Sequence, residues 1–416
     1  MTEASEPSSP SRAETGAPFV SLGGRLPGVM VVVGTRPEAI KMAPVVRALR
    51  RKGGRTRVHL LLTGQHTDLV SDALRTFRLS PDLDLAIMQE AQTLYDVASG
   101  CLTGVRDAVD RWDPSMVLVQ GDTATVFFSA LAGYFEGVAT AHVEAGLRSG
   151  DLRSPFPEEG FRRLTGVLAD LHFAPTPRAR ENLLAEGVPP DRIHVTGNTV
   201  VDALLQITRE TGMADDPRLA RILNDAVPFA LLTAHRREAW GEPLKRIFQG
   251  VKQLVDLEPD LHILYPVHPN PRIRGPAEEH LGGHPRIHLV DPLRYEDLAL
   301  ALQAARLVLT DSGGIQEEAP TFGTPLLVLR DVTERPEGIE AGVAELVGTD
   351  PHALVQGARR AFAGSSVGRT QRQLNNPYGD GRAALRIAAA LEAFLLGSPS
   401  SDLERLLRKE PEEASP

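Results

Sequence analysis

The sequence predicts an α/β protein with two Rossmann-like, doubly wound domains that face each other across a cleft. Short apolar runs rich in Val and Leu alternate with longer segments whose apolar residues recur every three or four positions. Apolar runs without polar alternation are typical of parallel strands covered on both faces, and the alternation of strand with helix is typical of βαβ units. Two strand-to-helix turns that contain glycine, GTRPE and DSGGIQEE, indicate two such sheets, each with a ligand site beyond the carboxyl ends of its strands.

The predicted strands form two series separated by a helix. The first series comprises residues 29–33, 58–63, 116–120, 139–143, 170–174 and 192–196, and the second comprises 229–233, 262–267, 286–290, 306–310 and 325–329. Residues 196–218 between them have the pattern of a helix that runs into a polar linker. We therefore expect one domain over 27–198, a second over 199–380, and a C-terminal helix over 381–397 that packs back on the first domain.

Both ends of the chain are polar. Residues 1–26 have no apolar segment of the kind found in a secretory signal, and they carry too little apolar surface to offset the entropy of ordering, so we expect a disordered tail. Residues 398–416 form a similar polar tail, although the stretch DLERLLRK within it could form a short helix.

The composition excludes several classes of function. The 416 residues include 45 Lys and Arg against 54 Asp and Glu, a net charge of −9, whereas a nucleic-acid-binding protein needs a basic footprint. Cys101 is the only cysteine, which excludes an intramolecular disulfide and a thiolate metal cluster and fits a cytoplasmic location. No apolar run is long enough to span a membrane, and neither HxxEH nor HExxH occurs, so we expect no metal site.

Charged residues follow the strand ends of the first domain. Arg36 lies at the start of a helix, where a cation is unfavourable unless an anion is nearby, whereas Lys41 on the same helix has the pattern of a surface residue. Asp122, Glu144 and Glu158 each have an ordinary explanation as helix-cap or loop residues. Together the three acids are expected to converge on one sheet edge, where neighbouring carboxyl groups push their pKa values apart and so suit acid/base chemistry.

The second domain has features that suit an anionic ligand. His235, Arg236 and Arg237 follow its first strand and are more typical of a phosphate site than of a surface charge run. His268 ends the next strand, where a loop histidine and a functional histidine are equally reasonable interpretations.

The turn DSGGIQEE has the most specific pattern in the second domain. Gly313 and Gly314 leave backbone N–H groups open at a helix start, which is typical of an anion cradle. Glu317 or Glu318 could hydrogen-bond the hydroxyls of a ribose. Neither the P-loop pattern nor the G-x-G-x-x-G fingerprint is present, so the sequence predicts neither ATP-type nor NAD binding.

A dozen motifs occur in order between about Gly34 and Gly381: GTRPEAIKMAPV, TGQH, VQGDT, HVEAGLRS, PFPEE, ADLHFAPT, VTGN, TAHRRE, YPVHPNP, LTDSGGIQEEAP, LRDVTERPEG and NPYGDG. In this set the chain resembles the non-hydrolysing UDP-N-acetylglucosamine 2-epimerases. The resemblance implies a glycosyltransferase-B-like fold with the active site in the cleft between the domains. It also implies reversible conversion of UDP-GlcNAc into UDP-ManNAc without a cofactor or a metal. The route it implies is anti elimination of UDP to give 2-acetamidoglucal, followed by re-addition with inverted C2.

The resemblance also implies roles for individual residues. The implied catalytic residues are Asp122, Glu144, Glu158 and His235. The implied substrate-binding residues are Arg36, Lys41, Arg162, Ser312, Gly313, Gly314, Glu318 and Arg335. Gln65, His66 and His268 lie in motifs near the regulatory UDP-GlcNAc site of the family, so UDP-GlcNAc is also an implied activator, and a homodimer is expected on the same ground.

The chain departs from the family pattern at two positions. Phe161 and Ala239 each stand where the family usually has Asn, and both replacements put an apolar group at a position expected near the cleft. Three other functions remain open: a glycosyltransferase of the same fold, a hydrolysing epimerase, and a sugar-nucleotide sensor. The three acids argue against the sensor, because a pure binder gains nothing from carboxylates beside an anionic ligand.

Overall fold

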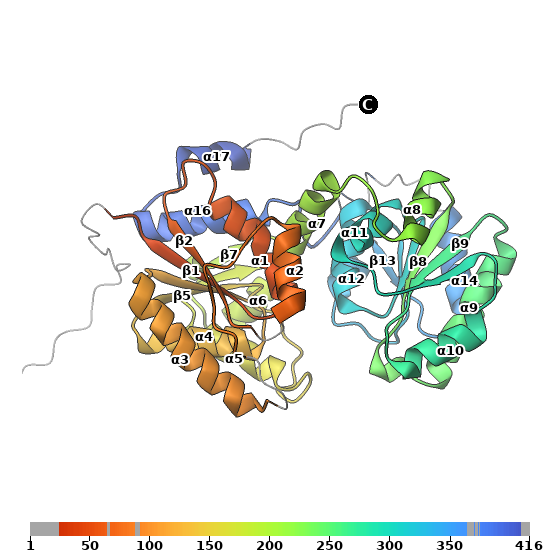
Figure 1. Ribbon diagram of the computed structural model, residues 1–416, viewed down its shortest axis with the longest axis horizontal. Coiled ribbons are helices and arrows are strands. Elements are labelled where there is room, and N and C mark those ends of the chain that lie inside the picture. The colour runs from red at the N-terminus through yellow and green to blue at the C-terminus, as the bar shows by residue number, and fades with distance from the viewer. Residues whose placement is uncertain are drawn as a thin grey trace, which may run out of the picture.

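The computed structural model describes residues 25–64, 67–87, 92–363, 370, 373 and 375–408. The tail predicted over residues 1–26 lies outside this part of the chain except for its last two residues, and so do Gln65 and His66. Two α/β domains lie side by side, with helix α7 (Thr199–Glu210) between them (Figure 1). None of the helices in the described ranges is long and apolar enough to cross a membrane.

The first domain is built on a seven-stranded parallel sheet with the order β3-β2-β1-β4-β5-β6-β7. Its strands are β1 (Gly28–Val33), β2 (Arg57–Leu62), β3 (Leu83–Asp84), β4 (Met116–Gln120), β5 (Ala139–Val143), β6 (Leu171–Ala174) and β7 (Ile193–Val195). Its helices are α1 (Arg36–Leu49), α2 (Thr67–Thr76), α3 (Leu94–Trp112), α4 (Ala124–Phe135), α5 (Glu158–Leu168) and α6 (Pro177–Ala185).

The apolar run of β1 is buried on both faces. Val29, Val31 and Val33 pack with the layer that contains α1, whereas Met30 and Val32 pack with the layer that contains α3 and α4. This two-sided burial explains why the strand reads as a continuous apolar run. It also places the turns that follow β1, β4 and β5 at one edge of the sheet.

The second domain is built on a six-stranded parallel sheet with the order β10-β9-β8-β11-β12-β13. Its strands are β8 (Phe229–Thr233), β9 (His262–Pro266), β10 (Ile287–Val290), β11 (Leu307–Thr310), β12 (Leu326–Val328) and β13 (Ala344–Leu346). Its helices are α8 (Pro217–Asn224), α9 (Glu242–Leu257), α10 (Pro271–Leu281), α11 (Tyr295–Ala304), α12 (Gly313–Glu318), α13 (Pro336–Glu340) and α14 (Pro351–Ala363), with short 3-10 helices η2 (Arg237–Ala239) and η3 (Ala319–Phe322).

The predicted fold class is confirmed, and each of the eleven predicted strands is present. The two strands that the sequence did not predict, β3 and β13, are edge strands of two and three residues. They are too short to produce a continuous apolar run, and none of their residues is fully buried. A strand of this length at a sheet edge leaves almost no signal in the sequence.

Helix α7 joins the apolar cores of the two domains. Ala203, Leu204 and Ile207 belong to one continuous cluster that includes buried side chains of α1 in the first domain and of α11 in the second. The helix packs against α1 on one side and against α11 and α12 on the other. The domains are therefore connected by packed apolar surface as well as by the chain itself.

The C-terminal helix α16 (Ala383–Leu396) returns to the first domain and packs on α1 (Figure 1). Asp202 on α7 fixes its start, because the carboxylate accepts hydrogen bonds from the backbone N–H groups of Ala383 and Ala384 at 3.1 and 2.9 Å. Burial raises the pKa of Asp202 to about 7. The cap thus connects the linker helix to the helix that closes the first domain.

The short helix that DLERLLRK could form within the predicted polar tail 398–416 is present. Residues 401–408 form helix α17 (Ser401–Arg408), and Leu403 is fully buried against the neighbouring core. Arg51 Nη2 donates to Ser400 Oγ and to Glu392 Oε1, both at 2.6 Å. The burial of Leu403 and the hydrogen bonds of Ser400 to Arg51 and Glu392 hold the start of α17 on the first domain. Residues 409–416 lie outside the described residues.

Candidate active site

Three of the cavities found among the described residues lie between the domains, and two of them contain predicted site residues. The first, which we call the α12 cavity, has a volume of about 500 Å³ and is lined from the first domain by Arg36, Pro37, Ile40 and Lys41, from α7 by Val200, and from the second domain by Thr233, His235, Pro266, His268, Pro292, Leu293, Tyr295, Leu298, Ser312, Gly314, Ile315 and Glu318. The second, which we call the arginine cavity, has a volume of about 330 Å³ and includes Arg148, Arg162, Arg178, Arg236 and Arg335 in its lining. Most of the predicted binding residues line one of these two cavities.

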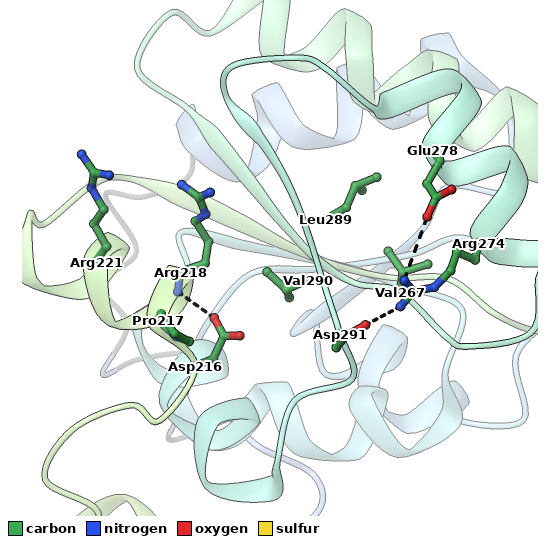
Figure 2. A pocket seen from close by; sticks show the side chains of 10 residues that line it. All are labelled: Asp216, Pro217, Arg218, Arg221, Val267, Arg274, Glu278, Leu289, Val290 and Asp291. Atoms are coloured by element: carbon green, nitrogen blue, oxygen red, sulfur yellow. Dashed lines mark hydrogen bonds and ion pairs between the residues drawn. The ribbon is translucent and has the colours of Figure 1, made fainter.

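The third cavity between the domains, of about 590 Å³, lies beside α2 and α7 and contains none of the predicted site residues. Another cavity, of about 620 Å³, lies within the second domain and contains none of them either (Figure 2). It is flanked by α8 and α10 and by the end of β10. Its charges are largely paired, since Arg274 binds Asp291 and lies 4.0 Å from Glu278, and Asp216 caps α8. We therefore place the candidate site in the cleft between the domains.

Glu144 is the central acid of the first domain. It follows β5 directly and has a φ of 63°, a left-handed conformation that costs about 1–3 kcal/mol for a residue with a side chain. Its Oε2 accepts hydrogen bonds from Lys41 Nζ at 2.6 Å and from Gln120 Nε2 at 2.5 Å. Burial raises the pKa of Glu144, the neighbouring Lys41 opposes this effect, and Glu317 and Asp122 add to it.

Lys41 connects Glu144 to the second domain. Its Nζ lies 3.7 Å from Oε2 of Glu317 on α12, so one ammonium group faces a carboxylate from each domain. Burial works against the charge of Lys41, yet the two carboxylates hold its pKa above the ordinary value. The pattern of α1 alone indicated a surface lysine, and the structure instead places Lys41 at the centre of a buried charge cluster.

Asp122 and Arg162 form an ion pair beside this cluster. Asp122 follows the turn after β4, and its carboxylate binds Arg162 of α5, which also lies 3.2 Å from Glu159. Glu158 begins α5, and no hydrogen bond or ion pair of its side chain is recorded within the described residues. The structure thus brings Asp122, Glu144, Lys41 and Arg162 to one side of the cleft, and Glu158 joins them through its place on α5 and not through a contact.

The turns that carry these residues are fixed by Glu38. Its carboxylate accepts hydrogen bonds from the backbone N–H of Gly34 at 2.6 Å and from Thr123 Oγ1 at 2.7 Å, which ties the turn after β1 to the turn after β4. A Cβ atom on Gly34 would lie 2.2 Å from Thr125 Oγ1, so only glycine fits there. The turns that hold Arg36 and Asp122 are thereby held together.

Two guanidinium groups of the second domain lie against the start of α12. A Cβ atom on Gly313 would lie 3.3 Å from Arg236 Nη2 and 3.8 Å from Arg335 Nη2, so the glycine lets both groups approach the helix start. Ser312 and Gly314 line the α12 cavity, and both arginines line the arginine cavity. Cations and open backbone N–H groups at one point are the features that bind phosphate.

His235 is held at the rim of the α12 cavity by Asp311. The Oδ2 atom of this buried aspartate accepts from the backbone N–H groups of His235 and Arg236, both at 2.8 Å. The imidazole of His235 stacks on that of His268 with ring centroids 5.8 Å apart. Burial lowers the pKa of His235, which favours the neutral imidazole at neutral pH.

Glu318 is a buried carboxyl group with unused hydrogen-bonding capacity. It lines the α12 cavity, and among the described residues its Oε2 atom has no hydrogen-bond partner. Burial raises the pKa of Glu318 to about 8. A buried polar atom without a partner is costly, and a ligand hydroxyl in the cavity would satisfy it.

Two residues that hold this arrangement together, Gln120 and Asn198, received no role from the sequence. Gln120 binds Glu144, Asn198 Nδ2 donates to Glu317 Oε2 at 3.1 Å, and Arg335 Nε donates to the other oxygen of Glu317. Gln120 is the last residue of β4 and lies within the motif VQGDT, and its place in that motif is the signal that the sequence gave. Asn198 reads as a helix cap and does cap α7, so its second bond was not visible in the pattern.

The expectation that Phe161 lies near the cleft is wrong. Phe161 is buried against α4, with ring centroids 5.4 Å from Phe127 and 5.7 Å from Phe128. It lies on the face of α5 that packs on α4, whereas Arg162, one residue further, points to Asp122. Ala239 is also buried, within η2.

Comparisons with known proteins agree with this geometry. Residues 47–392 match the family model described as UDP-N-acetylglucosamine 2-epimerase. The chain is 45% identical over 363 residues to the UDP-N-acetylglucosamine 2-epimerase of Bacillus subtilis, covering 87% of this chain and 94% of the relative. Its sequence is 37% identical to that of the protein in the crystal structure of UDP-GlcNAc 2-epimerase from Neisseria meningitidis bound to UDP-GlcNAc. The two structures superpose with a TM-score of 0.76 over 88% of this chain and 99% of that one.

A more distant neighbour shares the fold alone. The crystal structure of the glycotransferase of kitacinnamycin is 14% identical, with a TM-score of 0.62 over 89% of this chain and all of that one. The glycosyltransferase-B-like arrangement implied by the resemblance is therefore confirmed. With a family model that covers most of its length and relatives above 40% identity, the chain belongs to the UDP-N-acetylglucosamine 2-epimerase family.

Proposed function

We propose that this protein is an isomerase that interconverts UDP-GlcNAc and UDP-ManNAc by inverting C2. The observation that carries the proposal is the contact of Lys41 with Glu144 in one domain and Glu317 in the other, beside a turn with the chemistry of a diphosphate site. A proton-transfer group and a leaving-group site then face one sugar from opposite walls of a cleft. The relatives named as UDP-N-acetylglucosamine 2-epimerases support this substrate.

The α12 cavity has the chemistry that a uridine needs. Apolar side chains such as those of Ile40, Leu293 and Ile315 would cover the uracil ring, and the free oxygen of Glu318 would bind a ribose hydroxyl. The diphosphate would lie at the start of α12, between the glycine turn and the guanidinium groups of Arg236 and Arg335. The sugar would then extend toward Glu144 and Asp122.

The chemistry requires that proton removal and UDP departure be coupled. The hydrogen on C2 is not acidic, because neither C1 nor C2 carries a carbonyl group. A carboxylate takes this proton, the C2–H electron pair forms the C1=C2 double bond, and the C1–O pair leaves with the β-phosphate of UDP. Arg236, Arg335 and the start of α12 would stabilise the charge that builds on the diphosphate. Re-addition of UDP to C1, with a proton delivered to the opposite face of C2, gives the epimer without a cofactor.

A single assay tests this function. UDP-GlcNAc alone in deuterated water should yield UDP-ManNAc with deuterium at C2, followed by proton NMR. Free ManNAc with UDP would instead identify a hydrolysing epimerase. The absence of product until an acceptor is added would identify a glycosyltransferase, and the absence of product with or without an acceptor would identify a sensor.

We also propose a regulatory UDP-GlcNAc site near His268. The stacking of His268 on His235 supports it, because a ligand that moved one ring would move the other. Gln65 and His66, the other residues of the proposed site, lie outside the described residues. The initial rate in the same assay should depend on UDP-GlcNAc concentration in a sigmoidal manner, and a hyperbolic dependence would remove this site from the mechanism.

We further propose that the protein is a homodimer that uses the exposed apolar side chains of α4 and α5. Tyr134, Phe135, Leu164 and Val167 are at least half exposed on these two helices, which pack against each other. Sedimentation velocity should give twice the chain mass of 45.0 kDa, and Val167→Asp should shift the protein toward 45.0 kDa with an unchanged circular dichroism spectrum. A wild-type protein that sediments as a single chain at micromolar concentration would contradict this.

A further inference from the structure

Glu317 is the point at which three parts of the molecule meet. Its buried carboxylate accepts from Arg335 Nε in the second domain and from Asn198 Nδ2 at the start of α7, 3.1 Å away. Lys41 Nζ of the first domain lies 3.7 Å from the same oxygen that Asn198 binds. The implied family roles include the neighbouring Glu318 but assign nothing to Glu317, so its position requires a separate explanation.

The contacts of Glu317 form a chain that ends on the proposed proton-transfer group. Arg335 holds one oxygen of Glu317, the other oxygen faces Lys41, and Lys41 donates to Glu144 at 2.6 Å. Two carboxylates therefore compete for one ammonium group. Lys41 lies closer to Glu144 in this structure, in which Arg335 is bound to Glu317.

We propose that Glu317 is a positioning residue that couples binding of the UDP diphosphate to the basicity of Glu144. When phosphate oxygens engage Arg335, the guanidinium releases part of its hold on Glu317. The carboxylate of Glu317 then attracts Lys41 more strongly, and Glu144 loses part of its counter-ion. Glu144 becomes a stronger base only when a leaving group is in place. The inference rests on the proposed function and explains why Glu144 would be a weaker base when no UDP-sugar is bound.

The charges around Glu144 determine the sign of the effect. The groups that act on it are Lys41 from α1, Asp122 from the turn after β4, Glu317 from α12, Arg335 from the segment before α13, and the amide of Gln120. The pKa of Glu144 is raised by burial, is lowered by Lys41, and is raised by Glu317 and Asp122. Removing the charge of Glu317 should therefore lower the pKa of Glu144.

The pKa of Glu317 itself is consistent with a permanent anion. Burial works against its charge, but Arg335 and Lys41 hold the pKa of Glu317 below its ordinary value. The group is therefore ionised at neutral pH, and it acts there through its position and not through its own titration.

The test compares Glu317→Gln with Glu317→Asp, which keeps the charge, and with Glu345→Gln as a matched control. Glu345 is partly exposed in the same domain and forms an ion pair with Arg360. In Glu317→Gln we expect the acidic limb of the kcat profile to move down by about one pH unit, the scale of a single neighbouring charge. Glu317→Asp should restore most of the shift, and Glu345→Gln should leave the profile unchanged.

Carbon-13 NMR of the glutamate carboxyl groups gives a second readout that needs no turnover. The Glu144 signal, assigned by its loss in Glu144→Gln, should titrate at lower pH in Glu317→Gln than in the wild type. Adding UDP should raise the pKa of Glu144 in the wild type and should not do so in Glu317→Gln. The NMR titration tests the coupling even if the wild type makes no UDP-ManNAc, which would overturn the proposed function alone.

A purely structural role of Glu317 would produce a different pattern. It would lower the melting temperature, or lower kcat by the same factor at every pH, with the acidic limb and the Glu144 titration unchanged. That result, or a UDP response of Glu144 that persists in Glu317→Gln, overturns the inference.

Discussion

Glu144→Gln is expected to reduce kcat for UDP-GlcNAc epimerisation by about 10³-fold, within the range that a general acid or base contributes, while UDP affinity stays within about tenfold. Glutamine has the same size, and its amide oxygen can accept the hydrogen bonds that Lys41 and Gln120 now donate to Glu144. The geometry of the turn should therefore survive. What is lost is the ability to take a proton, so the effect should fall on kcat and not on binding.

The measurement pairs steady-state kinetics with calorimetric titration of UDP. Glu404→Gln, on the exposed face of α17, is the matched control and should match the wild type in both. Turnover of Glu144→Gln near the wild-type rate would exclude Glu144 from proton transfer. A loss of UDP affinity much larger than tenfold would instead show that Glu144 mainly supports the binding site.

The left-handed conformation of Glu144 agrees with this role. A non-glycine residue with a φ of 63° is held there by its surroundings, and such strain clusters at functional sites. The strand before it was predictable from the run ATAHV, and so was a carboxylate at the strand end. The conformation was not, because nothing in a glutamate signals a positive φ.

The sequence could predict which residues lie near the cleft but not how they pair. Glu317 and Glu318 were equivalent in the sequence analysis as partners for a ribose. Consecutive helical residues point about 100° apart, since a turn contains 3.6 residues. The structure directs Glu317 to Lys41 and Arg335 and leaves Glu318 in the α12 cavity. That choice depends on how α12 is rotated against α1, which is set by tertiary packing.

Phe161 is a second residue whose orientation on its helix could not be predicted from the sequence. A position two residues after the PEE motif was expected near the cleft, but Phe161 packs on Phe127 and Phe128 while its neighbour Arg162 reaches Asp122. Spacing along the sequence places a residue on a helix within about one turn. Which of two adjacent residues faces the ligand and which faces the core follows from the neighbouring helix, here α4.

Lys41→Met is expected to reduce both activity and stability, because Lys41 is the cation that Glu144 and Glu317 share inside the cleft. Methionine replaces the stem of the side chain but leaves two buried carboxylates without this counter-ion. Removing one partner of a buried ion pair costs about 3–5 kcal/mol, and we expect the free energy of unfolding to fall by about this amount at neutral pH. Because Glu144 also loses the hydrogen bond that Lys41 donates to its carboxylate, kcat should fall by at least about 10²-fold.

The loss of stability after Lys41→Met should depend on pH in a defined direction. Burial and Glu317 already raise the pKa of Glu144 above its ordinary value of 4.5, and removing Lys41 raises it further. A folded-state pKa above the unfolded one favours folding when the carboxyl is protonated, so the loss should grow as pH rises from about 4.5 through the folded pKa. Denaturant unfolding at pH 5 and pH 8 measures this, with Lys245→Met, which breaks an exposed ion pair with Glu242, as the control.

Adding Glu144→Gln to Lys41→Met should recover stability at pH 8 but not activity. Equal unfolding free energies for Lys41→Met and Lys245→Met at both pH values would show that the buried pairs contribute no net stability.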